Sequence, residues 1–239
     1  MAKRILCIGG HVGDLELTAG AVMASNAVDG GENFTLALTA GERGNPPHIS
    51  VADYRKQKIQ EAEAFASMVN GKAYVLDYPD AELPNNEQVR YEVANYIRKI
   101  CPDIIITHWK SEMHKDHNNT HYIVTEAAGM APLDCDRLEG ERCPNIPVYY
   151  AENWEDSSDF QPYIYVDVTR GYDLWCKALH THWIVMNSTS FPYYDYYTTL
   201  ARLRGCLNKT KYAMAFDVPS RKKVIRTDML LSKYNGVIL

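Results

Sequence analysis

The sequence lacks the features of a membrane, secreted or nucleic-acid-binding protein. No apolar run approaches the roughly 20 residues of a membrane helix, and the short apolar stretch near the start has no cleavage site after it, so we interpret it as a strand. The net charge of −5 predicts no affinity for nucleic acid or membrane surfaces. The six cysteines form no CxxC pair, which indicates reduced thiols and a cytoplasmic protein.

Apolar runs alternate with helical patterns over the first half of the chain. We predict strands at 4–10, 33–41, 72–79 and 103–109, and helices at 18–31, 51–69 and 85–100. This alternation is typical of a Rossmann-like α/β fold, in which helices cover both faces of a mostly parallel sheet. The second half is less regular, with strands at 147–154 and 163–169 and helices at 171–186 and 191–205. We find no linker, so we expect residues 1–239 to form a single domain.

The segment GGHVGDLELTAG, at 9–20, directly follows the first predicted strand. Its glycines suggest a phosphate-binding loop, but their spacing matches neither nucleotide-binding motif. Asp14 and Glu16 would also repel a phosphate at the start of the helix. A nucleotide-dependent enzyme is kept as an alternative that predicts tight binding of NAD or ATP.

A metal site explains this segment better. His11 and Asp14 follow the first strand, and the motif HKDH, which contains His114 and His117, follows the strand at 103–109. If these two strands are neighbours, both groups meet at one edge of the sheet. Catalytic zinc takes about three nitrogen or oxygen ligands, which His11, Asp14 and His117 supply. Such a set also accepts Fe²⁺ or Co²⁺.

These motifs resemble those of the LmbE/PIG-L family of zinc-dependent N-deacetylases. The segment at 10–20 is similar to the family motif A-H-P-D-D-x-E-x-x-x-G-G, and HKDH is similar to H-x-D-H. Further similarity covers the loop at 38–46, the helix at 54–71 and the strand at 160–169. The resemblance implies hydrolysis of an N-acetyl or other N-acyl group on a small molecule, above all an amino-sugar conjugate.

The resemblance also implies roles for single residues. His11, Asp14 and His117 would be the zinc ligands. His114 would stabilise the oxyanion and protonate the leaving amine, and Asp116 would orient His114.

Two further residues are expected to bind substrate. Arg55 matches a substrate-binding arginine of the family, and Glu42 lies in the loop that resembles the T-x-G-E-x-G segment.

Gly13 departs from the family pattern, because it replaces the aspartate that acts there as the general base. Three explanations are open. Another carboxylate serves as the base, with Glu16 nearest in sequence and Glu42 and Asp116 as the other candidates. Alternatively, zinc or the substrate makes a base unnecessary. In the third explanation, the site binds metal but its catalysis is lost or repurposed.

The segment FPYYDYYTTL, at 191–200, has four tyrosines within five residues. Tyrosines line sugar and aryl pockets, because they offer a flat apolar face and a polar group. They are also common at subunit interfaces. Both interpretations stay open, and since relatives form trimers or hexamers, we expect a homo-oligomer.

Overall fold

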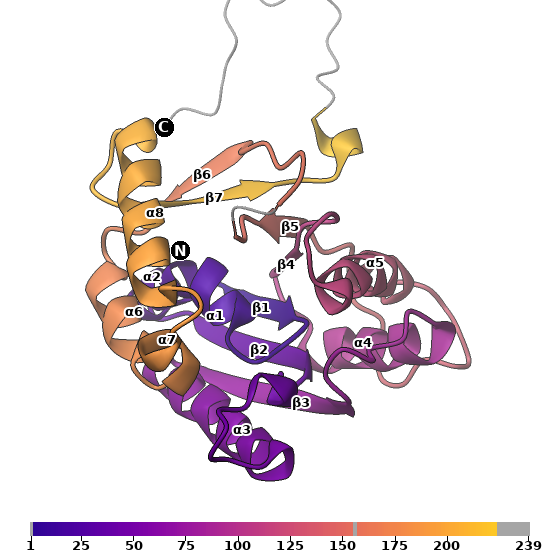
Figure 1. Ribbon diagram of the computed structural model, residues 1–239. Helices are drawn as coiled ribbons and strands as arrows, with labels where there is room; N and C mark the ends of the chain where they lie inside the picture. The colour runs from indigo at the N-terminus through magenta and orange to yellow at the C-terminus, as the bar shows by residue number, and fades with distance from the viewer. Residues whose placement is uncertain (1, 155–156, 224–239) are drawn as a thin grey trace, which may run out of the picture.

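The computed structural model describes residues 2–154 and 157–223, whose strands all belong to one sheet (Figure 1). The sheet has seven strands in the order β3-β2-β1-β4-β5-β7-β6. The strands are β1 (Arg4–Gly9), β2 (Glu32–Thr39), β3 (Gly71–Tyr78), β4 (Ile104–His108), β5 (Val148–Ala151), β6 (Ile164–Asp167) and β7 (Ala213–Asp217). The α-helices are α1 (Asp14–Thr18), α2 (Gly20–Val28), α3 (Val51–Met68), α4 (Glu87–Ile100), α5 (Lys115–Met130), α6 (Tyr172–Leu179), α7 (Trp183–Asn187) and α8 (Tyr193–Asn208). Two 3₁₀ turns, η1 (Glu42–Gly44) and η2 (Ser220–Lys222), complete the described elements.

Strand β1 lies between β2 and β4 and pairs with both in parallel. The register places Ile8 opposite Leu36 on one side and opposite Thr107 on the other. The expected adjacency of the first and fourth strands is therefore confirmed. Because these strands run in parallel, the loops after β1, β2 and β4 emerge at the same edge of the sheet.

Helices cover both faces of the sheet, with α2, α3 and α6 on one side and α4 and α5 on the other (Figure 1). The side chains of β1 alternate between these layers. Ile5 and Cys7 belong to the core under α2, α3 and α6, whereas Leu6 and Ile8 belong to the core under α4 and α5. A strand that is buried on both faces has a continuous apolar run in its sequence, and the segment of β1 has such a run.

The second half of the chain extends the same sheet. Strand β5 pairs with β4 in parallel, and β7 pairs in antiparallel fashion with β5 and β6. Strand β7 was not predicted. Its apolar run, AMAFD, is so short that the spacing of its apolar residues does not distinguish a strand from a helix. The helix predicted at 171–186 is divided into α6 and α7. Among the described residues, no helix combines the length and the hydropathy that a bilayer crossing requires.

Candidate metal centre and active-site cavity

A cavity of about 300 Å³ lies at the carboxyl edge of β1 and β4, as expected for a sheet of this kind. Its wall comes from the β1–α1 loop, the loops after β2 and β3, the start of α5, the segment after β5, and α8. Residues that line it include His11, Val12, Gly13, Asp14, Arg43, Lys58, Asp80, His114, His117, Asn153, Trp154, Tyr193 and Tyr197.

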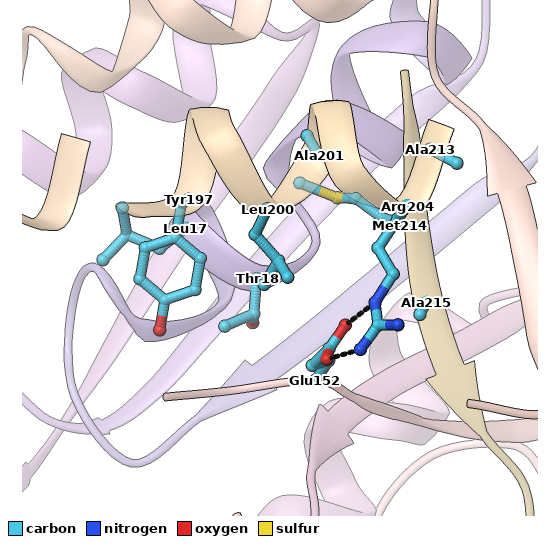
Figure 2. Close-up of a pocket in the computed structure, with 10 residues that line it drawn as sticks. All are labelled: Leu17, Thr18, Glu152, Tyr197, Leu200, Ala201, Arg204, Ala213, Met214 and Ala215. Atoms are coloured by element: carbon cyan, nitrogen blue, oxygen red, sulfur yellow. Dashed lines mark hydrogen bonds and ion pairs between the residues drawn. The ribbon is translucent and has the colours of Figure 1, made fainter. Parts of the chain in front are cut away.

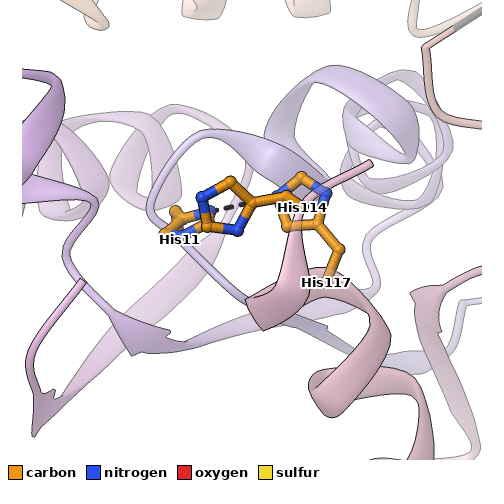
Figure 3. Close-up of side chains that lie close together, drawn as sticks. All are labelled: His11, His114 and His117. Carbon is orange, nitrogen blue, oxygen red and sulfur yellow. Dashed lines mark hydrogen bonds between the residues drawn. The ribbon is translucent and has the colours of Figure 1, made fainter. Parts of the chain in front are cut away.

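The three predicted metal ligands lie together in this cavity, and Figure 3 shows two of them, His11 and His117, beside His114. His11 Nδ1 is 3.2 Å from Asp14 Oδ2 and 3.1 Å from His117 Nε2. The third separation, from His117 Nε2 to Asp14 Oδ2, is 3.2 Å. Tetrahedral zinc with bonds of 2.0–2.1 Å needs ligand atoms about 3.3 Å apart. The donor atoms therefore have the chemistry and the spacing that such an ion requires.

A buried chain of hydrogen bonds orients His117. Glu112 Oε2 lies 2.7 Å from His117 Nδ1 and accepts a second hydrogen bond, of 2.7 Å, from Asn153 Nδ2. The Tyr197 hydroxyl donates to Asn153 Oδ1 at 2.6 Å. Although burial alone would raise it, the pKa of Glu112 falls to about 2 because of His108 and His117. Glu112 therefore accepts a hydrogen bond from the Nδ1–H group of His117. This leaves the Nε2 atom of His117 without a proton and able to bind a metal.

The supporting residues Glu112, Asn153 and Tyr197 were not predicted from the sequence. Glu112 precedes the HKDH motif by two residues, between β4 and α5. An acidic residue so close to a predicted metal ligand could have suggested a supporting role. Asn153 and Tyr197 come from distant segments, and their residue types carry no signal of their own.

His108, at the end of β4, lies beside the carboxylate of Asp14. Its Nε2 atom is 3.2 Å from Asp14 Oδ2 and accepts a 3.0 Å hydrogen bond from the backbone N–H of Gly10. The ring stacks on that of His117, with 4.2 Å between centroids. Burial favours the neutral form of Asp14, but His117 and His11 hold the pKa of this carboxyl well below its usual range.

Asp116 lies elsewhere than the resemblance implied. Its carboxylate is fully buried, accepts a 2.7 Å hydrogen bond from the N–H of Ala81, and has Oδ2 3.5 Å from His11 Nε2. Asp80 Oδ1 lies 3.1 Å from the same nitrogen. Asp116 makes no side-chain hydrogen bond to His114, because His114 caps α5 and accepts the backbone N–H of Asp116 instead. The two carboxylates thus face the nitrogen of His11 that points away from the ligand set.

His114 lines the cavity next to the ligand set. Its Nδ1 accepts the 3.2 Å hydrogen bond from the backbone of Asp116, so the neutral ring carries its proton on Nε2. Burial lowers the pKa of His114, and the charges of His11 and His117 lower it further. His114 is therefore a neutral hydrogen-bond donor at Nε2.

Besides Asp116, three predicted residues do not line the cavity in the part of the chain that the structure describes. Glu16 is buried and accepts a 3.0 Å hydrogen bond from the N–H of Gly13. Glu42 accepts the N–H of Asp80 at 3.0 Å and pairs with Arg55 at 3.3 Å. This ion pair supports the loop that carries Asp80.

The tyrosine-rich segment forms α8, and two of its tyrosines, Tyr193 and Tyr197, line the cavity with Trp154. This placement favours the pocket interpretation of that segment. Arg204 of α8 forms a two-pronged ion pair with Glu152, and its Nε donates to Oε2 at 2.8 Å (Figure 2). Because Glu152 precedes Asn153, this pair fixes α8 next to the chain that orients His117.

The fold and the site define an α/β protein with two histidines and one aspartate arranged for a metal ion at the carboxyl edge of its sheet. The PIG-L family model, described as GlcNAc-PI de-N-acetylase, matches residues 6–128, which is just over half of the chain. The protein belongs to this family.

Known proteins resemble most of the chain. A diacetylchitobiose deacetylase from Thermococcus kodakarensis is 25% identical over 229 residues, covering 88% of this chain and 81% of the relative. The structure of an N,N'-diacetylchitobiose deacetylase from Pyrococcus horikoshii superposes with a TM-score of 0.78 at 23% identity, covering 91% of this chain and 84% of that one. The structure of a 4-carboxy-2-hydroxymuconate hydratase from Pseudomonas putida KT2440 gives a TM-score of 0.83 at 20% identity, covering 96% and 100%. At these identities, the two structural similarities concern the fold alone.

Proposed function

We propose that the protein is a metal-dependent hydrolase that removes an N-acetyl or other N-acyl group from a small molecule, probed first as an amino-sugar conjugate. The observation that carries the proposal is the ligand set His11, Asp14 and His117, with donor atoms 3.1–3.2 Å apart and the N–H of His114 beside it. The deacetylase relative supports the class of substrate. Zinc is the proposed ion, and two histidines with one aspartate also suit Fe²⁺ or Co²⁺.

A bound zinc ion polarises a carbonyl group and lowers the pKa of water to about 7. His114 donates its Nε2 proton as a hydrogen bond to the amide oxygen and stabilises the charge that develops there. The departing amine takes the proton that the attacking water loses, because a neutral imidazole is too weak an acid to supply one. Trp154 and Tyr193 offer flat apolar faces to the substrate body.

Asp80 is a proposed positioning residue for His11, because its Oδ1 lies 3.1 Å from His11 Nε2, opposite the ligand atom Nδ1, and its Oδ2 accepts the N–H of Arg43 at 2.9 Å. Apart from the ligand Asp14, it is the carboxylate found in the cavity lining of the described residues. Glu16, Glu42 and Asp116, the three candidates from the sequence, do not line the cavity, and they accept the backbone N–H groups of Gly13, Asp80 and Ala81. We therefore propose that the ion or the substrate makes a separate base unnecessary, which leaves the rate lower by the roughly 10²–10⁴-fold that a positioned base contributes.

A second candidate is the addition of water to an activated carbon–carbon double bond. One observation favours it: Gly13 supplies no carboxylate where the deacetylase motif has its general base. Both reactions use water activated in the same cavity. They differ in the bond that changes, which an assay separates directly.

The test measures acetate release by the zinc-loaded protein from N-acetylated amino sugars, in parallel with loss of ultraviolet absorbance of an unsaturated carboxylic acid. We expect acetate release, a loss of most turnover in His114→Ala with zinc retained, and a loss of about 10–100-fold in zinc affinity or activity in Asp80→Asn. Glu82→Gln is the matched control, because Glu82 is exposed and pairs with Arg43 at the surface. Absorbance loss without acetate release would replace the first candidate with the second.

We also propose that the chain forms one domain and works as a cytoplasmic homo-oligomer. The shared sheet of all described strands supports the single domain. Size-exclusion chromatography with light scattering tests the oligomer, and a monomeric mass would contradict it.

A further inference from the structure

Lys58 carries a positive charge that the proposed reaction does not use. It lies on α3, is 3% exposed, and lines the cavity next to Gly13. Its Nζ donates a 2.6 Å hydrogen bond to the carbonyl oxygen of Val12, in the loop between His11 and Asp14. The amine is therefore fixed in the cavity wall beside the metal ligands.

This ammonium has no contact ion pair within residues 2–154 and 157–223, where no carboxylate oxygen lies within 4.0 Å of Nζ. Burial lowers the pKa of Lys58, while carboxylates at longer range raise it. These are Glu61, Asp14, Glu16 and Asp80. A buried cation without a contact counter-ion is costly, because it has lost water and gained no equivalent partner. A ligand that brings a negative charge would remove that cost.

Gly13 leaves the amine accessible from the cavity. A Cβ atom on Gly13 would have one neighbouring heavy atom within 4 Å, Lys58 Nζ at 3.6 Å. An aspartate here, as in the family motif that this segment resembles, would place its own carboxylate beside the amine. With glycine, the space next to Nζ is left for another group.

We propose that Lys58 binds a carboxylate of the substrate in the space beside Gly13, so that the substrates of this site are carboxylic acids. An ammonium group has three donors. Val12 takes one, and the others are available to a substrate oxygen. The inference rests on the proposed function, because it names a group that the substrate of the same cavity carries.

Isothermal titration calorimetry of the zinc-loaded protein tests this with two probes of matched shape. Succinate has two carboxylates, one for the metal centre and one for Lys58, whereas succinamate replaces one of them with a neutral amide. We expect the wild type to bind succinate at least about tenfold more tightly than succinamate, as for a charge-assisted hydrogen bond. Lys58→Met should reduce this ratio to near one, with the zinc content unchanged.

The matched control is Lys56→Met, because Lys56 lies two residues away on α3, points to the surface and pairs with Asp53 at 2.9 Å. It should keep the ratio of the wild type. If Lys58→Met fails to fold, Gly13→Asp replaces it, since the new carboxylate occupies the space beside Nζ and should also abolish the ratio.

Equal affinities in the wild type, or a ratio that survives in Lys58→Met, would overturn the proposal. Its failure is distinguishable from that of the proposed function. A preference for succinate without acetate release would contradict the deacetylase proposal and support the role of Lys58. Acetate release without a preference for succinate would support the deacetylase proposal and contradict the role of Lys58.

Discussion

Replacing Glu112 with glutamine should weaken zinc binding, although Glu112 is not itself a proposed ligand. Its Oε2 faces three nitrogens, at 2.7 Å from His117 Nδ1, 2.7 Å from Asn153 Nδ2 and 3.3 Å from His108 Nδ1. Glutamine keeps the shape of the side chain but loses its negative charge. If its NH₂ group takes the place of Oε2, two groups of hydrogen-bond donors face each other and no hydrogen bond forms. His117 then loses the partner that holds its proton on Nδ1 and its Nε2 toward the metal.

Loss of such a supporting carboxylate costs about 10–100-fold in metal affinity, or about 1.4–2.7 kcal/mol. Competition with a chromophoric chelator measures the zinc dissociation constant of wild type and Glu112→Gln. The matched control is Glu126→Gln, which removes an exposed carboxylate on α5 that pairs with Arg90. The control should keep its zinc affinity. A zinc affinity of Glu112→Gln within about twofold of wild type would refute the orienting role.

Three further predictions concern the same site. Gly13→Ala should lower the free energy of unfolding by about 1–2 kcal/mol, because the φ of +106° is unfavourable for a residue with a side chain, and a urea midpoint equal to wild type would contradict this. Tyr197→Phe leaves the buried Asn153 oxygen without its donor, so we expect a loss of about 1–3 kcal/mol and weaker zinc binding, with Tyr194→Phe as control. Removing zinc with a chelator should lower the melting temperature, since an ion at 100 times its dissociation constant adds about 2.7 kcal/mol, and an unchanged melting temperature would argue against a site in the folded state.

Much of the fold was predictable because its signals are local. The apolar runs of β1 and β4 identify strands buried on both faces, and alternation with helices indicates a parallel sheet. The convergence of His11, Asp14 and His117 was predictable for the same reason, since these residues lie in the segments that follow β1 and β4. Parallel neighbours bring their carboxyl ends together, so position in the sequence was enough to place them at one edge.

The roles of Asp116 and Glu16 were not predictable from the sequence. The cap of α5 determines the direction of the Asp116 carboxylate, because His114 takes the backbone N–H and leaves that side chain to face His11. The carboxylate of Glu16 accepts the N–H of Gly13 and does not line the cavity. Both outcomes depend on hydrogen bonds that spacing alone does not reveal.

The sequence by itself determined most strands of the sheet, the proposed ligand residues and the missing carboxylate at Gly13. Only the tertiary structure decided what surrounds them. Asn153 and Tyr197 reach His117 through the packing of α8 on the sheet, and Lys58 reaches Gly13 through the packing of α3. Such convergence depends on the order of strands and the position of helices, which distant residues determine jointly and no local pattern records.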